Sequence, residues 1–409
     1  MQRETTLLTQ EENDFLTSVG PETPAGQWHR RFWQPIAATD ELTDESPTRF
    51  VRVLGEDLVL FKDKSGNVGL IQDHCVHRGA SLLYGRVEER GIACAYHGWL
   101  YDTRGNCLET PAEPADSKFY LTVKARAYPV QRFIGMYWAY LGPDPAPVIP
   151  RYREWMKPAG EKMKVAVFPM LDCNWLVAAE NALDPAHLQI LHQDVASKEM
   201  VPINTTRGTT DDVKTFDFYE TPYGIMKQRT YMNDMVDEHS FVWPTYLTTS
   251  WIRTPVDDTH TMVFIVGGGY RVREGANLVE TEDAIVDRLP SLKDKPDARH
   301  PDAKYRFYAP FGQIAAQDHV VWETQGAIAD RTEERLATSD RGIVLLRQRL
   351  QENIQRVAEG LDPAGLIRDP DHEPIDTTMG RHRLTGQPQE ATKTPLAPRE
   401  QIVPSGRVW

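Results

Sequence analysis

The chain has 409 residues, 40% of them apolar and 26% charged, and a net charge of −13. This composition is that of a globular protein, and the length is sufficient for two domains with separate cores. The negative charge argues against non-specific binding to nucleic acids or anionic membranes, because their phosphates would repel the protein.

The N-terminal residues MQRETTLLTQEENDF lack the apolar stretch of a secretion signal. No apolar run approaches the roughly eighteen residues that a membrane-spanning helix needs. Four cysteines in a chain of this length are not a disulfide framework. The sequence therefore predicts a cytoplasmic protein in a reducing compartment.

Composition divides the chain into four segments. Residues 1–45 are expected to pack on the core. Residues 46–150 alternate short β-rich runs with glycine turns, which is typical of a small antiparallel β domain, and they end in the proline-rich linker GPDPAPVIPRY. Residues 151–360 mix helix-like and strand-like stretches and predict a larger domain. Residues 361–409 are polar and proline-rich, which predicts an extended arm.

The larger segment ends with a predicted helix within DRGIVLLRQRLQENIQRVAEGL, residues 340–361. Its apolar side chains recur at the spacing of one helix face. They are Ile343, Leu346, Leu350, Ile354 and Val357.

The stretch CVHRGASLLYGRVEERGIACAYHGW, residues 75–99, holds half of the cysteines of the chain. Cys75 is followed by His77 and, after sixteen further residues, Cys94 is followed by His97. A structural zinc site of this composition is one interpretation, although a zinc finger usually groups its cysteines in one pair and its histidines in another. With one residue of each kind on each arm, the pattern suits a 2Fe–2S cluster in which one iron takes both cysteines and the other both histidines.

The spacing C-x-H-x16-C-x2-H-G-W resembles the Rieske signature of the Rieske non-heme iron oxygenases. The resemblance implies that Cys75, His77, Cys94 and His97 bind the cluster, with HGWLYDTRGNC forming a hairpin-like shell beside it. Imidazole ligands raise the reduction potential, so such a cluster accepts electrons readily from a ferredoxin-type donor. A Rieske domain by itself also fits an electron carrier or part of a membrane complex, and the second half of the chain must decide.

A second cluster of possible ligands lies in CNWLVAAENALDPAHLQILHQD, residues 173–194. Asp184 and Pro185 predict a helix start, with Asp184 as N-cap and Pro185 at the first helical position. His187 then lies in the first turn, and His192 follows five residues later. Both imidazoles reach one ion only if the helix bulges or ends between them, and by spacing alone two ordinary histidines remain an equal alternative.

The pattern E-N-x2-D-x2-H-x4-H, preceded by N-W, matches the iron-binding helix of the same family and follows the first motif in the expected order. The resemblance implies that His187 and His192 belong to a 2-His-1-carboxylate triad with open positions for dioxygen. The carboxylate is expected from Asp318, in AAQDHVVWETQG on the long C-terminal helix. Glu323 is the rival acid, and His319 is not expected to be a ligand.

Asp184 has a second possible role besides that of a helix cap. In the family, the matching aspartate links the iron-ligand histidine of one subunit to a cluster histidine of its neighbour. The resemblance therefore favours Asp184 as a catalytic bridge for electrons between subunits.

The family implies an α+β fold, with a small antiparallel β Rieske 2Fe–2S domain and a larger catalytic domain of antiparallel sheet and helices, the helix-grip or START-like arrangement. It also implies the function of a terminal oxygenase with a 2Fe–2S cluster and mononuclear Fe(II). A separate NAD(P)H-dependent reductase would supply electrons, and the subunits would form a head-to-tail trimer or a multiple of it. The alternatives are a Rieske-type electron carrier and an aromatic-ligand binding protein without oxygenase activity.

Three stretches resemble the phthalate dioxygenase group: TPAGQWHRRFWQP near the start, TPVDDTHT at residues 254–261 and QGAIADRTEERLATSDRGIVLLR at residues 325–347. Enzymes of that group mostly hydroxylate or O-demethylate aromatic carboxylates, and the same triad serves both reactions. Each stretch also has a purely structural interpretation as a turn or a solvated helix entry.

An arginine in an apolar pocket would bind such a carboxylate. Strand alternation puts Thr249, Trp251 and Arg253 on one face, and Arg229 and Tyr231 on another. The predicted pocket residues are Arg229, Trp251 and Arg253, and a salt-bridged surface arginine is the alternative for either cation.

Overall fold

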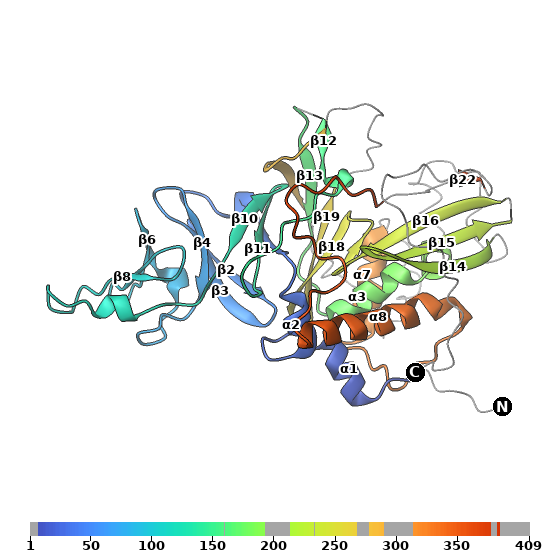
Figure 1. Ribbon diagram of the computed structural model, residues 1–409, viewed down its shortest axis with the longest axis horizontal. Helices are drawn as coiled ribbons and strands as arrows, with labels where there is room; N and C mark the ends of the chain where they lie inside the picture. Colours follow the sequence, from blue (N-terminus) through green and yellow to red (C-terminus); the bar gives the residue numbers. More distant parts are fainter. Residues whose placement is uncertain are drawn as a thin grey trace, which may run out of the picture.

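The computed structural model describes residues 7–158, 160–192, 213–232, 234–267, 278–289, 314–377 and 383–384. These residues form an elongated molecule, with small β-sheets at one end and a large sheet with helices at the other (Figure 1). The predicted α+β fold with a small antiparallel β domain is confirmed. No helix in the described parts of the chain is both long and apolar enough to cross a membrane.

Three antiparallel sheets form the small end of the molecule. The first has the order β2 (Thr48–Val53), β3 (Glu56–Lys62), β4 (Val68–Gln72) and β9 (Ala127–Tyr128). The second has the order β5 (Arg86–Glu88), β6 (Gly91–Ala93), β7 (Leu100–Tyr101) and β8 (Cys107–Glu109). The third has the order β1 (Gln34–Ala38), β11 (Met136–Ala139) and β10 (Val130–Phe133). The N-terminal segment thus contributes a strand, β1, to this end.

Strand β3 joins the two ends because both of its faces are buried. Leu58 and Leu60 belong to the core that continues into the helices of the large end. Val59 and Phe61 belong to a second core, which contains the cysteines of the 75–99 stretch. Side chains alternate along a strand, so this single strand packs against both cores.

The large sheet has the order β14-β15-β16-β17-β18-β19-β13-β21, with β22 paired to β16. Its strands are β13 (Met163–Val167), β14 (Val213–Thr221), β15 (Gly224–Tyr231), β16 (Met235–Val242), β17 (Tyr246–Leu247), β18 (Trp251–Asp257), β19 (His260–Val266), β21 (Ala284–Arg288) and β22 (Arg383–Leu384). The pairing is antiparallel except between β13 and β21, which run parallel, a departure from the wholly antiparallel sheet expected. A separate ribbon pairs β12 (Lys157–Pro158) with β20 (Leu278–Val279).

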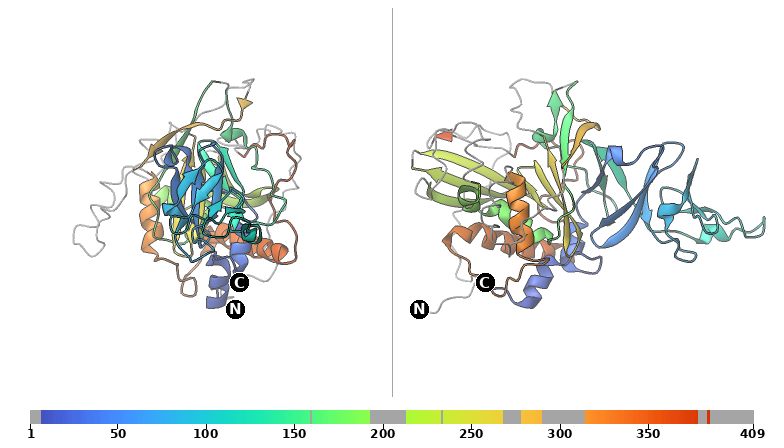
Figure 2. Two further views of the ribbon diagram at one scale, coloured as in Figure 1. Left: turned by 90° about the vertical axis from the view of Figure 1, so that its left-hand side faces the viewer. Right: turned by 180° about the vertical axis from the view of Figure 1, so that it is seen from behind.

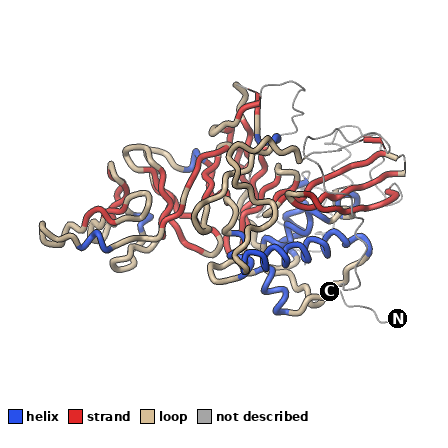
Figure 3. Tube along the Cα trace, in the orientation of Figure 1, coloured by secondary structure: helices blue, strands red, loops and turns tan. Residues whose placement is uncertain are grey.

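The helices are α1 (Gln10–Thr17), α2 (Pro24–His29), α3 (Trp175–Leu183), α4 (His187–Ile190), α7 (Ile314–Thr324) and α8 (Arg341–Ala358). They gather on one side of the large sheet (Figures 2 and 3), and α2 also shares a buried core with β2 and β3 of the small end. The helix predicted from its apolar spacing is present as α8. Its residues Leu346, Leu350, Ile354 and Val357 are buried, and Ile343 is half-buried.

A buried ion-pair network holds α3 in place. The carboxylate of Glu180 accepts two hydrogen bonds from Arg331, at 2.9 and 2.8 Å, and one from Arg347 on α8, at 2.7 Å. Burial would raise the pKa of Glu180, but the two guanidinium groups lower it to about 2. Helix α3 is therefore tied to α8 and to the loop before it through one charged side chain.

We expect Glu180→Gln to lower the free energy of unfolding by about 3 kcal/mol at pH 7, because two buried guanidinium groups lose their shared carboxylate. Urea denaturation measures the change. The folded pKa lies below the unfolded value, so this contribution is present above about pH 4.5 and is lost as the pH falls toward 2. The exposed variant Glu352→Gln is the control, and an equal loss in both would contradict the role of the network.

Candidate metal centres

The two arms of the cysteine–histidine motif fold into matching loops. In each loop the cysteine N–H donates to the carbonyl five residues later, at 2.9 Å for both Cys75 and Cys94. A glycine four residues after each cysteine donates back to the cysteine carbonyl, at 2.8 Å from Gly79 and 2.9 Å from Gly98. Both glycines have positive φ, 74° and 72°, which favours glycine over other residues in these turns.

The loops bring the four predicted ligands together with thiols inside and imidazoles outside. Cys75 and Cys94 are buried in one core. The rings of His77 and His97 lie 4.5 Å apart, and His77 is exposed and stacks on the ring of Trp99 at 4.3 Å. Two buried thiols behind two outer imidazoles fit a 2Fe–2S cluster whose histidine-bound iron lies nearer the surface.

Tyr101 on β7 is a residue of this centre that the sequence analysis missed. Its hydroxyl lies 3.2 Å from Cys75 Sγ. Burial raises the pKa of Tyr101 well above its usual value, so the hydroxyl stays protonated and can donate to a thiolate. The remaining cysteine of this core, Cys107, lies outside both loops, and its thiol contacts the carbonyl of Glu109 at 3.4 Å.

The second centre forms where α3 ends and α4 begins. Asp184 is the C-cap of α3, and α4 starts at His187, so the predicted helix start at Asp184 and Pro185 is wrong. Asp184 Oδ1 nevertheless accepts from the backbone N–H groups of Ala186 and His187, at 2.7 and 3.4 Å. Helix α4 ends at Ile190, before His192. The break expected between the two histidines is therefore present.

His187, His192 and Asp318 converge at this break. Asp318 Oδ1 lies 3.1 Å from His192 Nε2 and 3.9 Å from His187 Nε2. One ligand atom from each residue falls within 4.8 Å of the others, so the three can hold a single metal ion. Asp318 comes from α7, a separate short helix, and not from the long C-terminal helix as expected. Asn181 on α3 donates to the same carboxylate oxygen at 3.5 Å.

The other ring nitrogen of each histidine faces a side-chain oxygen, at hydrogen-bond distance in His192 and at ion-pair distance in His187. Gln317 Oε1 lies 2.8 Å from His192 Nδ1, and Asp184 Oδ2 lies 3.4 Å from His187 Nδ1. A proton on Nδ1 leaves the lone pair of Nε2 free for a metal, which is the usual arrangement of a metal-binding histidine. His192 Nε2 is buried and faces Asp318 Oδ1 at 3.1 Å, as expected of two ligand atoms that share one ion. The residues therefore fit a mononuclear metal, and Gln317 was not found from the sequence.

Glu323 and His319, the two other side chains that the sequence analysis considered near Asp318, have partners outside this triad. Glu323 Oε1 accepts a hydrogen bond from the backbone N–H of Asp172 at 2.9 Å. The His319 ring packs edge-on against Phe168, with the centroids 4.8 Å apart. Neither belongs to the three-residue group that can hold an ion.

The sheet face toward the triad carries buried cations. Arg229 and Tyr231 share a face as predicted, but Arg229 is ion-paired with Asp237 on the neighbouring strand. Arg229 is thus salt-bridged, as in the alternative interpretation, although it is buried and not on the surface. Lys227 is also buried and donates to the backbone carbonyl of Asp184 at 3.1 Å.

Arg253 on β18 has no carboxylate within ion-pair distance in the described part of the chain. It is 1% exposed and donates to the carbonyl of Thr245 at 3.3 Å. The rings of Trp251 and Trp322 flank it, with centroids 6.0 and 5.6 Å from its Cζ. Burial lowers the pKa of Arg253 to about 10, and Asp318 partly opposes this effect. Thr249 lies before β18 with a φ of 53°, so the alternation that grouped it with Trp251 does not reach it.

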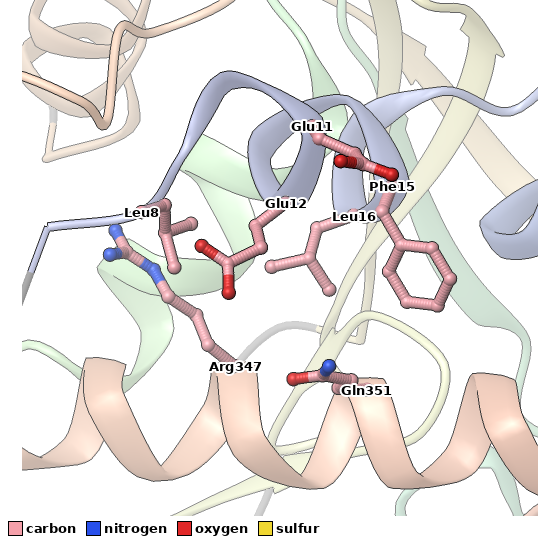
Figure 4. Close-up of a pocket in the computed structure, with 7 residues that line it drawn as sticks. All are labelled: Leu8, Glu11, Glu12, Phe15, Leu16, Arg347 and Gln351. Carbon is pink, nitrogen blue, oxygen red and sulfur yellow. The ribbon is translucent and has the colours of Figure 1, made fainter. Parts of the chain in front are cut away.

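A cavity of about 160 Å³ lies apart from both centres, between α1 and α8 (Figure 4). It is lined by Leu8, Glu11, Glu12, Phe15, Leu16, Arg347 and Gln351. None of these is a predicted site residue. Glu12 is engaged in the capping box of α1 with Thr9.

Both the first and the second half of the chain match known protein families. Residues 32–129 match the family described as Rieske [2Fe-2S] domain, and residues 304–374 match the LigXa C-terminal domain like family. The chain is 35% identical over 382 residues to the 5,5'-dehydrodivanillate O-demethylase oxygenase subunit of Sphingobium sp. (strain NBRC 103272 / SYK-6), covering 89% of this chain and 84% of that relative. It is 33% identical over 383 residues to the phthalate 4,5-dioxygenase oxygenase subunit of Pseudomonas putida, covering 84% of this chain and 85% of the relative.

A solved structure supports the fold. The terminal oxygenase of carbazole 1,9a-dioxygenase from Nocardioides aromaticivorans IC177 superposes with a TM-score of 0.55 at 17% identity, covering 84% of this chain and 99% of that one. The two relatives at 35% and 33% identity confirm the family predicted from the sequence motifs. The chain belongs to the Rieske non-heme iron oxygenases, in the group that contains phthalate dioxygenase, and is the oxygenase component of such a system, with a 2Fe–2S cluster and a mononuclear iron as its cofactors.

Proposed function

We propose that this oxygenase hydroxylates or O-demethylates an aromatic carboxylate with dioxygen and electrons from a separate NAD(P)H-dependent reductase. The proposed cluster ligands are Cys75, His77, Cys94 and His97, and the proposed iron ligands are His187, His192 and Asp318. The convergence of the three iron ligands, with the buried Arg253 close enough for Asp318 to influence its pKa and no carboxylate paired with it among the described residues, is the observation that carries the proposal.

The iron, when bound, supplies the redox chemistry that activates dioxygen. The protein's own groups prepare the site. His187 on α4, His192 after it and Asp318 on α7 would hold the ion, and a three-residue set of this kind would leave positions open for dioxygen and solvent. Gln317 contacts Nδ1 of His192, and Asp184 faces Nδ1 of His187. These contacts orient both Nε2 atoms toward Asp318.

The substrate class follows from the charges of the sheet face. Among the described residues of this face, Lys227, Arg229 and Arg253 are buried basic side chains, and Asp237 is paired with Arg229. A substrate carboxylate would satisfy Arg253 bidentately, while Trp251 and Trp322 would contact an aromatic ring. Relatives named for dehydrodivanillate, phthalate and phenoxybenzoate are consistent with an anionic aromatic substrate.

We propose a head-to-tail trimer, because the two centres of one chain lie at opposite ends of the molecule. The loops beside β6 are at the tip of the small end, whereas α3 and α7 lie in the large end (Figures 1 and 2). The exposed His77 ring is available to a neighbouring chain. The side chain of Asp184 contacts His187 and is a quarter exposed. A closed ring satisfies such a heterologous contact without polymerisation.

Asp184 can act as cap and bridge at once, because its two carboxylate oxygens have different partners. Oδ1 accepts from the backbone of the α4 entry, and Oδ2 faces His187 Nδ1. Burial raises the pKa of Asp184, but the contacts with His187, with the Ala186 N–H and with Lys227 together lower it below its usual value, so the carboxylate stays charged. A cluster histidine of the neighbouring subunit would donate to a remaining lone pair.

We also propose that the enzyme works in the cytoplasm. All four cysteines are free thiols in the structure, which suits a reducing compartment. We also propose that the domain boundaries lie at residues 45, 150 and 360, as expected from the sequence.

The iron assignment is tested by Asp318→Ala, with Glu323→Ala as the matched control from the same helix. We expect Asp318→Ala to lower the iron content from about three to about two atoms per chain and to leave the visible spectrum of the cluster unchanged. Glu323→Ala should keep about three. Metal analysis and absorption spectroscopy give both values. Two irons per chain in the unaltered protein would instead favour an electron carrier.

The route of the electrons is tested by mixing two inactive variants. Cys94→Ser removes the cluster and Asp318→Ala removes the iron, so neither variant alone should be active. In rings assembled from both, an intact cluster of one chain lies next to an intact iron site of another, and we expect a substantial part of the activity to return. Dioxygen uptake measures the rescue. If rings of verified mixed composition remain inactive, electrons travel within one chain.

The substrate class is tested by Arg253→Gln with acids and their methyl esters. We expect the unaltered enzyme to bind the acid about 30-fold more tightly than its ester, because the ester leaves a buried guanidinium unpaired. In Arg253→Gln this preference should largely disappear. KM values for phthalate, vanillate and 5,5'-dehydrodivanillate and for their methyl esters measure it. A preference that survives in the variant assigns carboxylate binding to another residue.

A further inference from the structure

Lys227 makes the contact between the large sheet and the turn that carries Asp184. It lies in β15, and its ammonium group reaches the backbone carbonyl of Asp184 at 3.1 Å. Lys227 is 3% exposed. Across the sheet it is paired in register with His239, and Arg229 follows on the same face of β15. Lys227 thus reaches out of a rigid strand to the end of α3.

The other polar groups of Asp184 are satisfied within its own segment. Its N–H donates to the carbonyls of Glu180 and Asn181, at 3.1 and 3.2 Å, which ends α3. Its Oδ1 accepts from the entry to α4, and its Oδ2 faces His187. Of these contacts, the one from Lys227 comes from the sheet. It therefore sets how far the turn, and with it the Asp184 carboxylate, stands from the sheet.

A buried lysine at this position lowers the stability of the folded protein. Burial, and next the charge of Arg229, lower the pKa of Lys227 to about 7, although Asp184, Asp237 and Asp318 partly offset this. A buried ammonium group opposes folding, and an apolar side chain of similar length would pack there at lower cost. A residue that costs stability and contacts a functional turn is a candidate for a role in the reaction.

We propose that Lys227 is a positioning residue for electron transfer, which holds the Asp184 turn so that the carboxylate meets His187 on one side and the neighbouring subunit on the other. This inference rests on the proposed role of Asp184 as the bridge. A residue with a merely structural role would instead contribute to stability and to iron binding.

The test compares Lys227→Met, which keeps the length but removes the donor, with Lys227→Arg, which keeps a charged donor. Lys214→Met, on the exposed side of the neighbouring strand β14, is the control. The reduced full-length enzyme is mixed with dioxygen and the best substrate among phthalate, vanillate and 5,5'-dehydrodivanillate. The return of the oxidised cluster spectrum gives the rate of electron transfer. Melting temperature and iron content are measured on the same samples.

We expect Lys227→Met to melt at the same or a higher temperature, to keep its iron and its cluster spectrum, and to reoxidise the cluster at least tenfold more slowly. Lys227→Arg should recover part of the rate, and Lys214→Met should match the unaltered enzyme. An unchanged rate in Lys227→Met, or a slower rate accompanied by loss of iron and a lower melting temperature, would overturn the inference.

A parallel measurement on Asp184→Asn separates this inference from the proposed function. If Asp184→Asn reoxidises at the normal rate, the bridge itself is refuted, and the positioning role of Lys227 fails with it. If Asp184→Asn is slow while Lys227→Met is normal, the bridge stands and only the role of Lys227 is refuted. Slow reoxidation in both, with iron retained, supports both.

Discussion

The break between α3 and α4 at Asp184 is the constraint on which the catalytic end depends. A helix that continued from His187 through His192 would carry their rings apart, because residues five positions apart do not share a face. Helix α3 instead ends at Leu183, and the short helix α4 starts at His187 and ends at Ile190, before His192, so that both rings point toward Asp318. The Glu180 network holds the first helix from one side, and Lys227 holds the turn from the sheet.

The two candidate centres are built in different ways. The cysteine–histidine centre comes from two short loops with the same hydrogen-bond pattern, closed by glycines and backed by one small core. The iron centre combines segments more than a hundred residues apart in the chain, and its geometry depends on how α3 and α7 pack together. The first is a local structure and the second a tertiary one. Strand β3 connects them, since its two faces belong to the two cores.

Electrostatics distinguish the two arginines that were equivalent in the sequence. Arg229 faces Asp237 across neighbouring strands, so its charge is neutralised inside the protein. Arg253 faces two tryptophans and a backbone carbonyl, and its burial is compensated only in part. An anionic ligand gains most at the cation that no carboxylate of the described residues neutralises. Whether each arginine is neutralised therefore depends on the position of a carboxylate that the protein supplies, as much as on the arginine itself.

By itself, the sequence determined the features whose signals are local: the family through two spaced motifs, the small β domain through its turns, and α8 through its apolar period. The tertiary structure alone decided that Asp318 lies on a separate helix, that Asp184 ends one helix instead of starting another, and that Thr249 falls outside β18. It also decided which groups Tyr101, Lys227 and Gln317 contact. Each of these is a common residue type with no distinctive spacing in the sequence. Spacing encodes which residues share a loop or a helix face, whereas the partner of a buried polar group is chosen by the packing of segments that are distant in the chain.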